Sequence, residues 1–341
     1  MSDPIRLCVV GCGRVAKSHC EGALQVPEDI QITAVVSRNV DKREAFQRDY
    51  CVPAGYATLA EACASGDFDA VDICLPNFLH EEAVETAAAA GKHVLVEKPM
   101  ANTVSGCKQM VKACEEAGVT LMVGQSRRYH DAVLESKKLL EAGEIGELVA
   151  ISGTLMGYLP SPPTEWWRDK NLTGGLMIPL WGNHIIDYIL YMFDELPTRV
   201  YCEAFTVNPK WEGEDETSIV LGFRDNRFAT IRMSWNTRFE EDKIWRGEKR
   251  MLASKDVLYE RYIQGSEGTL KLEDETRLLK NGSIVIDGEQ QITAFARQYQ
   301  EFTASIREKQ EPMTGGKAGI GLIRIQEAAL ESAATHKVIE L

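Results

Sequence analysis

The chain has 341 residues, and at roughly 150 residues per domain this length predicts two domains. It carries 38 Lys and Arg against 51 Asp and Glu, a net charge of −13, with no basic block. This balance disfavours a nucleic-acid partner and an anionic membrane surface, both of which need clustered positive charge. The content of 44% hydrophobic and 26% charged residues is typical of a globular chain.

No apolar run reaches the roughly 20 residues of a membrane span, and the N-terminus has no secretory signal pattern. The nine cysteines follow no metal-ligand or disulfide spacing. We therefore expect a cytoplasmic protein with no metal site and no membrane association.

Residues 5–123 alternate between short apolar runs and helical patterns. The apolar runs are typical of strands buried on both faces of a parallel sheet, and they cover residues 5–10, 32–37, 70–75, 93–97 and 120–124. Helices are expected near residues 14–24, 41–50, 58–64, 79–90 and 103–117. Asp41 and Glu44 have the spacing of a capping box at the second helix. The alternation predicts a doubly wound Rossmann domain over residues 1–124.

The pattern changes after about residue 125. A helix near 131–142 precedes runs of strand character at residues 148–155, 198–207, 217–223, 228–235, 257–265, 268–273 and 283–287. Polar alternation in several runs indicates a sheet with one solvated or partner-covered face. Further helices are expected near 182–193, 293–307 and 318–334. Residues 125–341 are therefore predicted to form an α+β domain with a mostly antiparallel sheet, which binds substrate; its last helix is free to pack back on the first domain.

A glycine-rich turn follows the first strand and opens a helix, with the pattern G-x-G-x-x-A from Gly11 to Ala16. Gly11 permits the tight turn, Gly13 lets the backbone approach a pyrophosphate, and Ala16 allows close helix packing. The helix N-terminus favours the negative charge of the phosphates. The turn predicts dinucleotide binding, with contacts also from Arg14 and Val15.

The end of the second strand bears on cofactor choice. It reads Ser37-Arg38, where NAD enzymes usually carry a carboxylate for the ribose. A guanidinium can bind a 2′-phosphate with charge-assisted hydrogen bonds, so NADP(H) is preferred and NAD(H) stays possible. Two alternatives remain open: Arg38 is only a solvated charge at the helix entry, or Asp41 reaches the ribose.

Several further motifs, in order along nearly the whole chain, carry a resemblance to a known family. These are Pro76-Asn77-x-x-His80, Glu97-Lys98-Pro99, Arg128-Tyr129, Gly174-Gly175 followed by Gly182-x-His184-x-x-Asp187, and Gly265-Ser266-Glu267-Gly268. With the glycine turn, the sequence resembles the Gfo/Idh/MocA oxidoreductases. The resemblance implies a Rossmann domain and a second domain with a large open sheet, through which members form homodimers or homotetramers. It also implies hydride transfer between nicotinamide and a sugar, a cyclitol or a related alcohol or ketone.

Hydride transfer from an alcohol needs a base at the hydroxyl and a group that stabilises negative charge there. The resemblance gives the second role to Lys98, at the carboxyl end of a parallel strand; the alternative is a surface ion pair with Glu97. His184 is the expected acid/base, because an unperturbed imidazole titrates near neutrality. His19, His93, His130 and His336 are interpreted as structural.

The remaining cofactor contacts are assigned along the motifs. His80 is interpreted as a cofactor-side residue, with helix capping as the alternative. The full cofactor set is Gly11, Gly13, Arg14, Val15, Ser37, Arg38, Leu75, Pro76, Asn77, His80, Glu97, Lys98 and Arg168.

One position departs from the family pattern. The family usually has Asp four residues before the catalytic histidine, whereas this chain has Leu180, and the segment is one residue longer. Without that carboxylate the pocket becomes more apolar, and His184 would be oriented by Asp187 or another group. Asp187 can equally be a helix-surface charge.

The substrate side is predicted from position and residue type. Aromatic rings stack on the C–H faces of sugars, although Trp166 and Trp167 can equally be packing residues. An apolar wall suits a glycoside, a deoxy sugar or a cyclic diol at least as well as a free polyol. The predicted set is Lys98, Arg128, Tyr129, Tyr158, Trp167, Leu180, Asn183, His184 and Asp187.

Two other functions fit the same motifs. A glycoside hydrolase or lyase with tightly bound NAD would oxidise its substrate only transiently and turn over without net reduction of cofactor. A cofactor-binding protein without catalysis would lose only affinity when Lys98 or His184 is replaced. The presence of both Lys98 and His184 argues against a cofactor-binding protein without catalysis.

Overall fold

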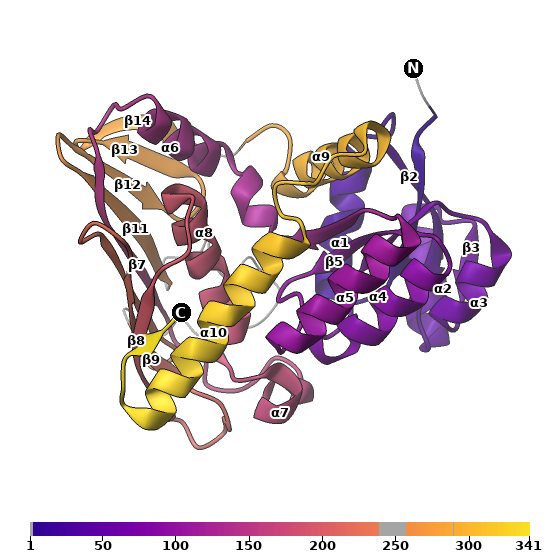
Figure 1. Cartoon of the computed structure of the whole chain (residues 1–341). Coiled ribbons are helices and arrows are strands. Elements are labelled where there is room, and N and C mark those ends of the chain that lie inside the picture. Colours follow the sequence, from indigo (N-terminus) through magenta and orange to yellow (C-terminus); the bar gives the residue numbers. More distant parts are fainter. Residues whose placement is uncertain (1–2, 239–256, 289) are drawn as a thin grey trace. The chain divides into compact units, whose positions relative to one another are not determined.

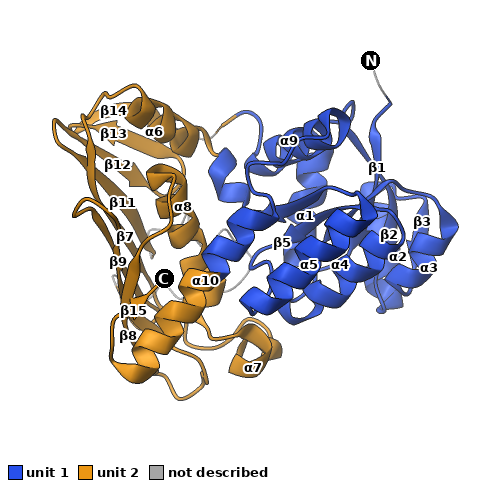
Figure 2. Ribbon diagram, viewed as in Figure 1, with its two compact units in different colours: residues 1–129, 291–323 blue, residues 130–290, 324–341 orange. Residues whose placement is uncertain are grey.

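The computed structural model describes residues 3–238, 257–288 and 290–341. It contains two compact units, shown in Figure 2. Unit 1 comprises residues 1–129 and 291–323, and unit 2 comprises residues 130–290 and 324–341. The chain thus returns to unit 1 after unit 2, and helix α10 (Gly316–Thr335) begins in one unit and ends in the other.

Unit 1 is built on a six-stranded parallel sheet in the order β3-β2-β1-β4-β5-β6 (Figure 1). Its strands are β1 (Ile5–Val10), β2 (Ile30–Val36), β3 (Ala54–Tyr56), β4 (Ala70–Ile73), β5 (His93–Glu97) and β6 (Leu121–Gly124). Its helices are α1 (Arg14–Ala23), α2 (Val40–Tyr50), α3 (Leu59–Ser65), α4 (His80–Ala89), α5 (Val104–Ala117) and α9 (Ala294–Glu308), with short turns η1 (Asn77–Leu79) and η2 (Ser126–Tyr129). The predicted Rossmann fold is confirmed. Strand β3 was not predicted, because three residues give no readable alternation.

The late helix α9 belongs to unit 1 because it packs closely on α1. A Cβ at Gly22 of α1 would lie 2.6 Å from the Cβ of Phe295, so only a glycine permits this approach. Tyr299 and Phe302 of α9 are fully buried in the same hydrophobic core as the strands β1 and β2. The first unit is therefore completed by a segment far away in the sequence.

The expected capping box at Asp41 is wrong. Helix α2 begins at Val40, and its N-cap is Asn39, whose side chain accepts a hydrogen bond from the backbone N–H of Lys42 at 2.9 Å. Asp41 instead lies in the first turn, where its charge favours the helix N-terminus. A capping box does form one helix later, between Thr58 and Glu61.

Unit 2 is built on a nine-stranded sheet in the order β14-β13-β12-β11-β7-β10-β9-β8-β15. Neighbouring strands are antiparallel except β7 and β10, as predicted for a mostly antiparallel sheet. The strands are β7 (Leu148–Met156), β8 (Arg199–Phe205), β9 (Glu216–Gly222), β10 (Phe228–Ser234), β11 (Leu258–Gly265), β12 (Thr269–Glu273), β13 (Arg277–Lys280), β14 (Ser283–Asp287) and β15 (Ile339–Glu340). The helices are α6 (Asp131–Glu141), α7 (Lys170–Thr173) and α8 (Asn183–Phe193), with the turn η3 (Glu165–Trp167) and the π-helix η4 (Ile178–Gly182).

One face of this sheet carries exposed apolar side chains. Tyr262, Ser152, Thr230 and Val220 are directly paired across four adjacent strands, so their side chains share a face. Tyr262 and Val220 are exposed, as is Phe228 two residues from Thr230 on the same strand. The opposite face packs under α6 and α8, which contact the strands β7, β12 and β13.

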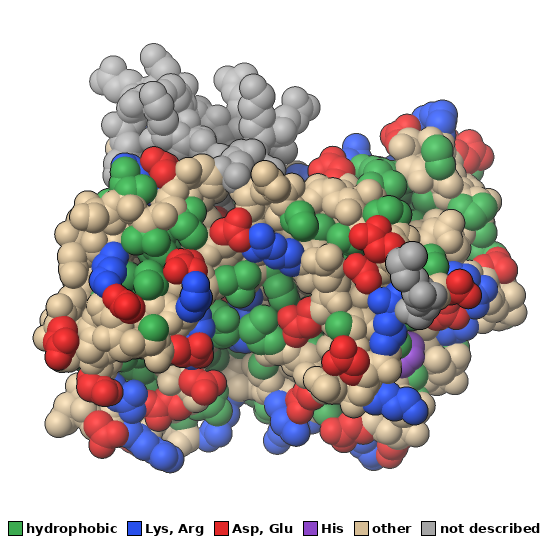
Figure 3. Space-filling model, turned by 90° about the horizontal axis from the view of Figure 1, so that it is seen from above, with side chains coloured by type: hydrophobic (Ala, Val, Ile, Leu, Met, Phe, Trp, Pro, Cys, Tyr) green, Lys and Arg blue, Asp and Glu red, His purple; other side chains and the backbone are tan. Residues whose placement is uncertain are grey.

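Acidic and basic side chains are interspersed on the face of the molecule seen in Figure 3. Among the described residues, no helix combines the length and apolar character that a membrane crossing needs.

Candidate functional site

Four of the predicted segments meet at one edge of the unit 1 sheet. Gly11 follows β1, Ser37 follows β2, Leu75 lies just beyond β4, and Lys98 follows β5. These strands are parallel, so their carboxyl ends lie at the same edge. The strand order reverses between β1 and β4, and in open α/β sheets ligands bind at such a point.

The glycine turn at the end of β1 has the geometry of a phosphate cradle. Gly11 has φ +107°, and a Cβ there would lie 2.8 Å from the carbonyl oxygen of Cys74. Gly13 is the N-cap of α1, and a Cβ there would meet no atom within 4 Å. No side chain caps this helix end, so its N–H groups are available to a phosphate. The turn fits the pyrophosphate of a dinucleotide.

The end of β2 carries more positive charge than the sequence indicated. Arg38 is exposed, and Arg43 on α2 donates a hydrogen bond at 2.8 Å to the carbonyl oxygen of Ser37. The charges of Arg43 and Lys42 lower the pKa of the half-buried Cys12 in the glycine turn, although burial raises it more. The sequence analysis did not predict Arg43 as a site residue. It lies beside Ser37 because helix α2 turns its side chain back toward the end of β2.

His80 connects two of the loops at the edge. Its ring Nε2 lies 2.9 Å from the carbonyl oxygen of Leu75, and Nδ1 lies 3.0 Å from that of Pro99 and 3.2 Å from that of Met100. The ring is buried, and burial lowers its pKa. These hydrogen bonds differ from both predicted roles, which were a cofactor contact and a helix cap. The ring joins the loop at Leu75 to the loop that follows Lys98.

Asn77 lies in the same motif. It is buried, and its amide donates a hydrogen bond to the side chain of Asn102. This contact ties η1 to the segment that follows Pro99, so it reinforces the His80 connection.

Lys98 is half-buried at the carboxyl end of β5, and the peptide bond to Pro99 is cis. Burial lowers the pKa of Lys98 to about 8, against the charge of Glu97, which raises it; Arg127 and Arg14 lower it further. Glu97 itself is buried, and one of its carboxylate oxygens accepts the backbone N–H of Lys98 at 3.0 Å. An amine that titrates near neutrality is suited to proton chemistry.

Arg128 and Tyr129 were predicted to bind substrate, but the structure places both in the interior of unit 1. Arg128 donates a hydrogen bond to the carbonyl oxygen of Met313 at 3.3 Å. Tyr129 belongs to the hydrophobic core, and burial together with the charge of Glu301 raises the pKa of its hydroxyl. Both residues join η2 to the returning segment of unit 1, and their contact with substrate stays a prediction.

His184 lies on the first turn of α8 in unit 2, directly after the π-helix η4. A π-helix accommodates one extra residue in a helical segment, and it often marks a functional site. It therefore explains how the longer segment between Gly175 and His184 is absorbed. Leu180 within η4 is buried, as are Asn183 and Asp187 on α8.

The surroundings of His184 are aromatic. The ring of Trp181 lies edge-on to the imidazole with centroids 6.2 Å apart, and edge-on to Trp235 at 5.3 Å. Both tryptophans are buried. Together with the buried Leu180 they give this segment an apolar character.

Glu214 anchors the start of the π-helix and was not predicted. One carboxylate oxygen accepts the backbone N–H groups of Leu176 at 3.0 Å and Ile178 at 2.9 Å. Burial raises the pKa of Glu214, while these hydrogen bonds lower it. Gly175 has φ +131°, and a Cβ there would approach both carboxylate oxygens of Glu214 at 3.1 Å. The glycine therefore leaves the space in which the carboxylate of Glu214 lies. Glu214 lies 30 or more positions from its partners, and no local pattern signals it.

The loop before the glycines holds the last predicted residues. Tyr158 accepts a hydrogen bond from Arg238, whose guanidinium also lies 3.9 Å from the ring centroid. The rings of Trp166 and Trp167 are edge-on at 6.0 Å. Arg168 donates to the carbonyl oxygen of Lys210 at 3.1 Å. These contacts all lie within unit 2.

A pocket of about 420 Å³ in unit 2 is separate from these residues. It is lined by the end of α6, the end of α8 and the start of β7, and it contains none of the predicted site residues. Four acidic side chains face it, Glu141, Glu147, Asp194 and Glu267, together with Lys137.

The two glycines of the turn make a matched test of dinucleotide binding. Gly13→Ala is expected to leave the melting temperature unchanged, because its φ of −86° suits alanine and the added Cβ meets no protein atom. The same Cβ would occupy the approach of the pyrophosphate, so NADPH affinity should fall by roughly tenfold or more. Gly11→Ala should lower the melting temperature as well, because of its φ and the clash with Cys74. Fluorescence titration and thermal unfolding measure both; unchanged NADPH affinity in Gly13→Ala would contradict the assignment.

Glu214 is expected to stabilise unit 2 as a hydrogen-bond acceptor. Glu214→Ala leaves two buried N–H groups without their acceptor and should lower the free energy of unfolding by about 1–3 kcal/mol, whereas Glu214→Gln keeps an acceptor and should lose less. Since the pKa of Glu214 is raised by burial, wild-type stability should decline as the pH rises past 4.5, and the Gln variant should lack this decline. Urea unfolding at several pH values tests this, with the exposed Glu212→Ala as control.

Comparison with known proteins agrees with this geometry. The model of the oxidoreductase family with an NAD-binding Rossmann fold matches residues 5–125, and that of the GFO/IDH/MocA C-terminal domain matches residues 133–271. The chain is 25% identical to D-xylose 1-dehydrogenase [NADP(+)] of Haloarcula marismortui, and the match covers 99% of this chain and 94% of that one. It is 24% identical to D-apiose dehydrogenase of Rhizobium rhizogenes, and that match covers 98% of this chain and 96% of the relative. The crystal structure of aldose-aldose oxidoreductase from Caulobacter crescentus superposes with a TM-score of 0.86 at 25% identity, covering 99% and 100%. The chain therefore belongs to the Gfo/Idh/MocA family, and it is an NAD(P)-dependent oxidoreductase.

Proposed function

We propose that this protein transfers a hydride between a nicotinamide cofactor and a sugar, cyclitol or cyclic-diol-type alcohol or ketone. The observation that carries the proposal is Lys98: a half-buried amine with a pKa of about 8, at the carboxyl end of β5 and at the same sheet edge as the glycine turn. A bound nicotinamide supplies the hydride acceptor or donor.

Lys98 acts on the substrate oxygen. In its protonated form the Nζ stabilises the negative charge that develops on this oxygen as the hydride leaves carbon. The low pKa of Lys98 makes the ammonium a better proton donor at neutral pH than an ordinary lysine would be. This supports a role in ketone reduction as well as in alcohol oxidation.

His184 is the proposed acid/base that takes or returns the hydroxyl proton. Its aromatic and aliphatic neighbours, Trp181, Trp235 and Leu180, favour a substrate with an exposed C–H face over one with a hydroxyl at every position. The dehydrogenases of D-xylose and D-apiose named above act on sugars, which agrees with a carbohydrate-like substrate. Asn183 and Asp187 on α8, Tyr158 and Trp167 complete the proposed substrate side.

We further propose NADP(H) as the preferred cofactor, with NAD(H) possible. Arg38 and Arg43 bring two guanidinium groups to the end of β2, where the 2′-position of the ribose binds in this fold. The chain has no carboxylate at Ser37-Arg38 to repel a phosphate there.

The exposed face of the nine-stranded sheet supports a homodimer or homotetramer. Tyr262, Val220 and Phe228 place large apolar side chains on a flat surface of paired strands, where monomeric proteins rarely gather them. We propose that a second copy of the chain covers this face.

Replacing Lys98 tests the proposed reaction. Lys98→Met should lower kcat for NADPH-linked turnover by roughly 10²–10³-fold, because charge stabilisation in the transition state is lost. Wild-type activity that depends on the ammonium should fall as the pH rises through about 8. The control is Lys92→Met, which removes the lysine before the other end of β5, where Nζ donates to the carbonyl oxygen of Phe68 at 2.8 Å.

The same assay separates the other functions. Stoichiometric consumption of NADPH with a ketose or an inosose, or its formation with the alcohol, supports the proposal. Substrate turnover with bound cofactor and no net change in NADPH would instead identify a glycoside hydrolase or lyase. Cofactor binding with no turnover of a broad sugar panel would refute an enzymatic role.

Cofactor preference is tested at the end of β2. Arg38→Ala and Arg43→Ala should each weaken NADPH binding by roughly tenfold, about 1.4 kcal/mol, and change NADH binding little, because only NADPH carries the 2′-phosphate. Arg48→Ala, at the exposed far end of α2, is the control. Equal losses for both cofactors would show that the arginines support the fold rather than select the phosphate.

A further inference from the structure

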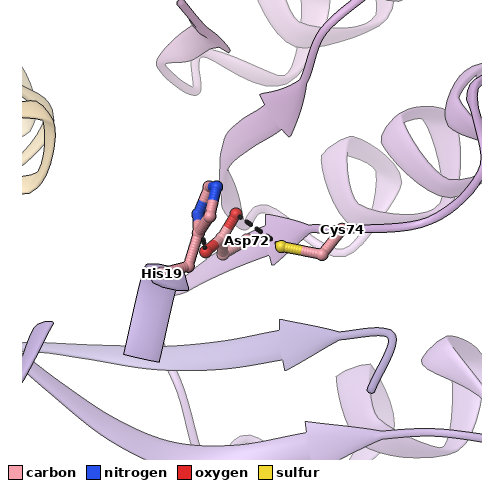
Figure 4. A group of neighbouring side chains, drawn as sticks. All are labelled: His19, Asp72 and Cys74. Atoms are coloured by element: carbon pink, nitrogen blue, oxygen red, sulfur yellow. Dashed lines mark hydrogen bonds and ion pairs between the residues drawn. The ribbon is translucent and has the colours of Figure 1, made fainter. Parts of the chain in front are cut away.

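Beneath the edge that carries Lys98 lies a buried cluster of polar side chains, shown in part in Figure 4. His19 on α1 is fully buried between two carboxylates: Nδ1 lies 2.7 Å from Asp72 on β4, and Nε2 lies 3.0 Å from Glu97 on β5. Asp72 also accepts hydrogen bonds from Tyr299 and from the thiol of Cys74, the latter at 3.6 Å. The ring of Phe295 covers the imidazole at 4.7 Å between centroids.

The geometry favours a charged imidazole. A neutral ring donates from one nitrogen only, so one of the two carboxylates would face a lone pair; the imidazolium donates to both. Burial lowers the pKa of His19, but the charge of Asp72 and its hydrogen bond outweigh burial and raise the pKa well above its usual value. The positive charge offsets two buried negative ones, which would otherwise repel each other.

His19, Asp72 and Cys74 also have the composition of a metal site, since their ligand atoms lie within 4.8 Å of one another. The hydrogen bonds argue against a metal. Each ring nitrogen already faces a carboxylate oxygen, and Asp72 already accepts hydrogen bonds from Tyr299 and Cys74, so these ligand atoms are engaged with one another.

The cluster reaches the proposed catalytic lysine through Glu97. One oxygen of this carboxylate faces His19, and the other accepts the backbone N–H of Lys98 at 3.0 Å. Gly124 on β6 leaves room for this carboxylate, because a Cβ at that position would lie 3.1 Å from the oxygen that faces His19. Glu97 is therefore fixed from both sides, and the backbone of Lys98 with it.

We infer that His19 is a positioning residue for the proposed reaction: through Glu97 it holds the turn that presents Lys98 and keeps a negative charge beside the amine. This inference rests on the role of Lys98 in the proposed function. It assigns a purpose to a histidine that the sequence suggested was only structural, and none of its atoms needs to contact substrate or cofactor.

The charges around Lys98 determine what loss of His19 would do. Glu97 raises the pKa of Lys98, whereas burial, Arg127 and Arg14 lower it. Without the imidazolium, Asp72 keeps two other donors, Tyr299 and Cys74, whereas the oxygen of Glu97 that faced His19 loses that donor. Glu97 then holds its negative charge beside the amine less firmly. The pKa of Lys98 should then fall, and the activity lost at alkaline pH should be lost at lower pH.

The first test is a pH profile. His19→Gln and His19→Asn place a neutral amide near one or the other nitrogen, and each should move the alkaline limb of kcat downward by roughly one pH unit, the usual effect of a neighbouring charge. Glu97→Gln should produce the same shift, and the double variant His19→Asn/Glu97→Gln should add nothing to it. An additive second shift would show that His19 does not act through Glu97.

The control is His93→Gln. His93 lies at the start of the same strand, where its Nδ1 accepts the backbone N–H of Thr120 at 3.0 Å, so its loss should leave the alkaline limb unchanged. If His19 were only a packing residue, its variants would lower the melting temperature and leave the limb in place, as in this control.

The second test is independent of activity and of whether the variants fold. In wild-type protein labelled with [15N]histidine, the ring of His19 should remain doubly protonated at pH 8. The signal of this ring is identified by through-bond assignment, or by its absence from the spectrum of His19→Gln. A neutral ring at pH 7, or one metal ion per chain by elemental analysis, would overturn the inference. A wild-type protein that transfers no hydride, with the ring still charged, would instead overturn the proposed function alone.

Discussion

The close contact between the glycine turn and β4 is the constraint on which the rest of the site depends. Gly11 leaves room for the carbonyl oxygen of Cys74 only because it has no Cβ, and this lets the loops after β1 and β4 lie side by side where the strand order reverses. With the two loops in contact, the N-terminus of α1 opens toward the same edge as Leu75 and Lys98. A parallel sheet supplies the edge, and this contact lets the glycine turn lie against the loop that follows β4 there.

Buried polar side chains, rather than regular secondary structure, then hold the loops in place. His80 bonds to backbone carbonyl groups of two loops, Glu214 accepts two N–H groups at the start of the π-helix, and Glu97 accepts the N–H of Lys98. Each buried group is matched by partners, as it must be to avoid the cost of an unsatisfied polar atom. Because these bonds join segments far apart in the sequence, the loops are rigid without being helical or extended, which is what preorganised catalysis needs.

Periodicity and glycine positions predicted five strands of the parallel sheet, most helices and the mostly antiparallel second sheet, because buried parallel strands and amphipathic helices have local signatures. The predictions failed where long-range contacts decide. Arg128 and Tyr129 carry no local sign that residues 291–323 return to cover them, and Asn39 displaced Asp41 as a cap by a shift of two residues. Glu214 and Arg43 were missed for the same reason: each functions through a partner that the fold, and not the spacing, brings near.

The replacement at Leu180 shows how the two kinds of information combine. The sequence indicated an extra residue and a lost carboxylate; the structure has a π-helix in this segment and buries Leu180 within it. A buried carboxylate at this position would need hydrogen-bond donors to offset its burial. The apolar wall is thus a property of the whole segment, and restoring the acid alone would place a charge in apolar surroundings. The proposed preference for a substrate with an exposed C–H face rests on this wall rather than on position 180 alone.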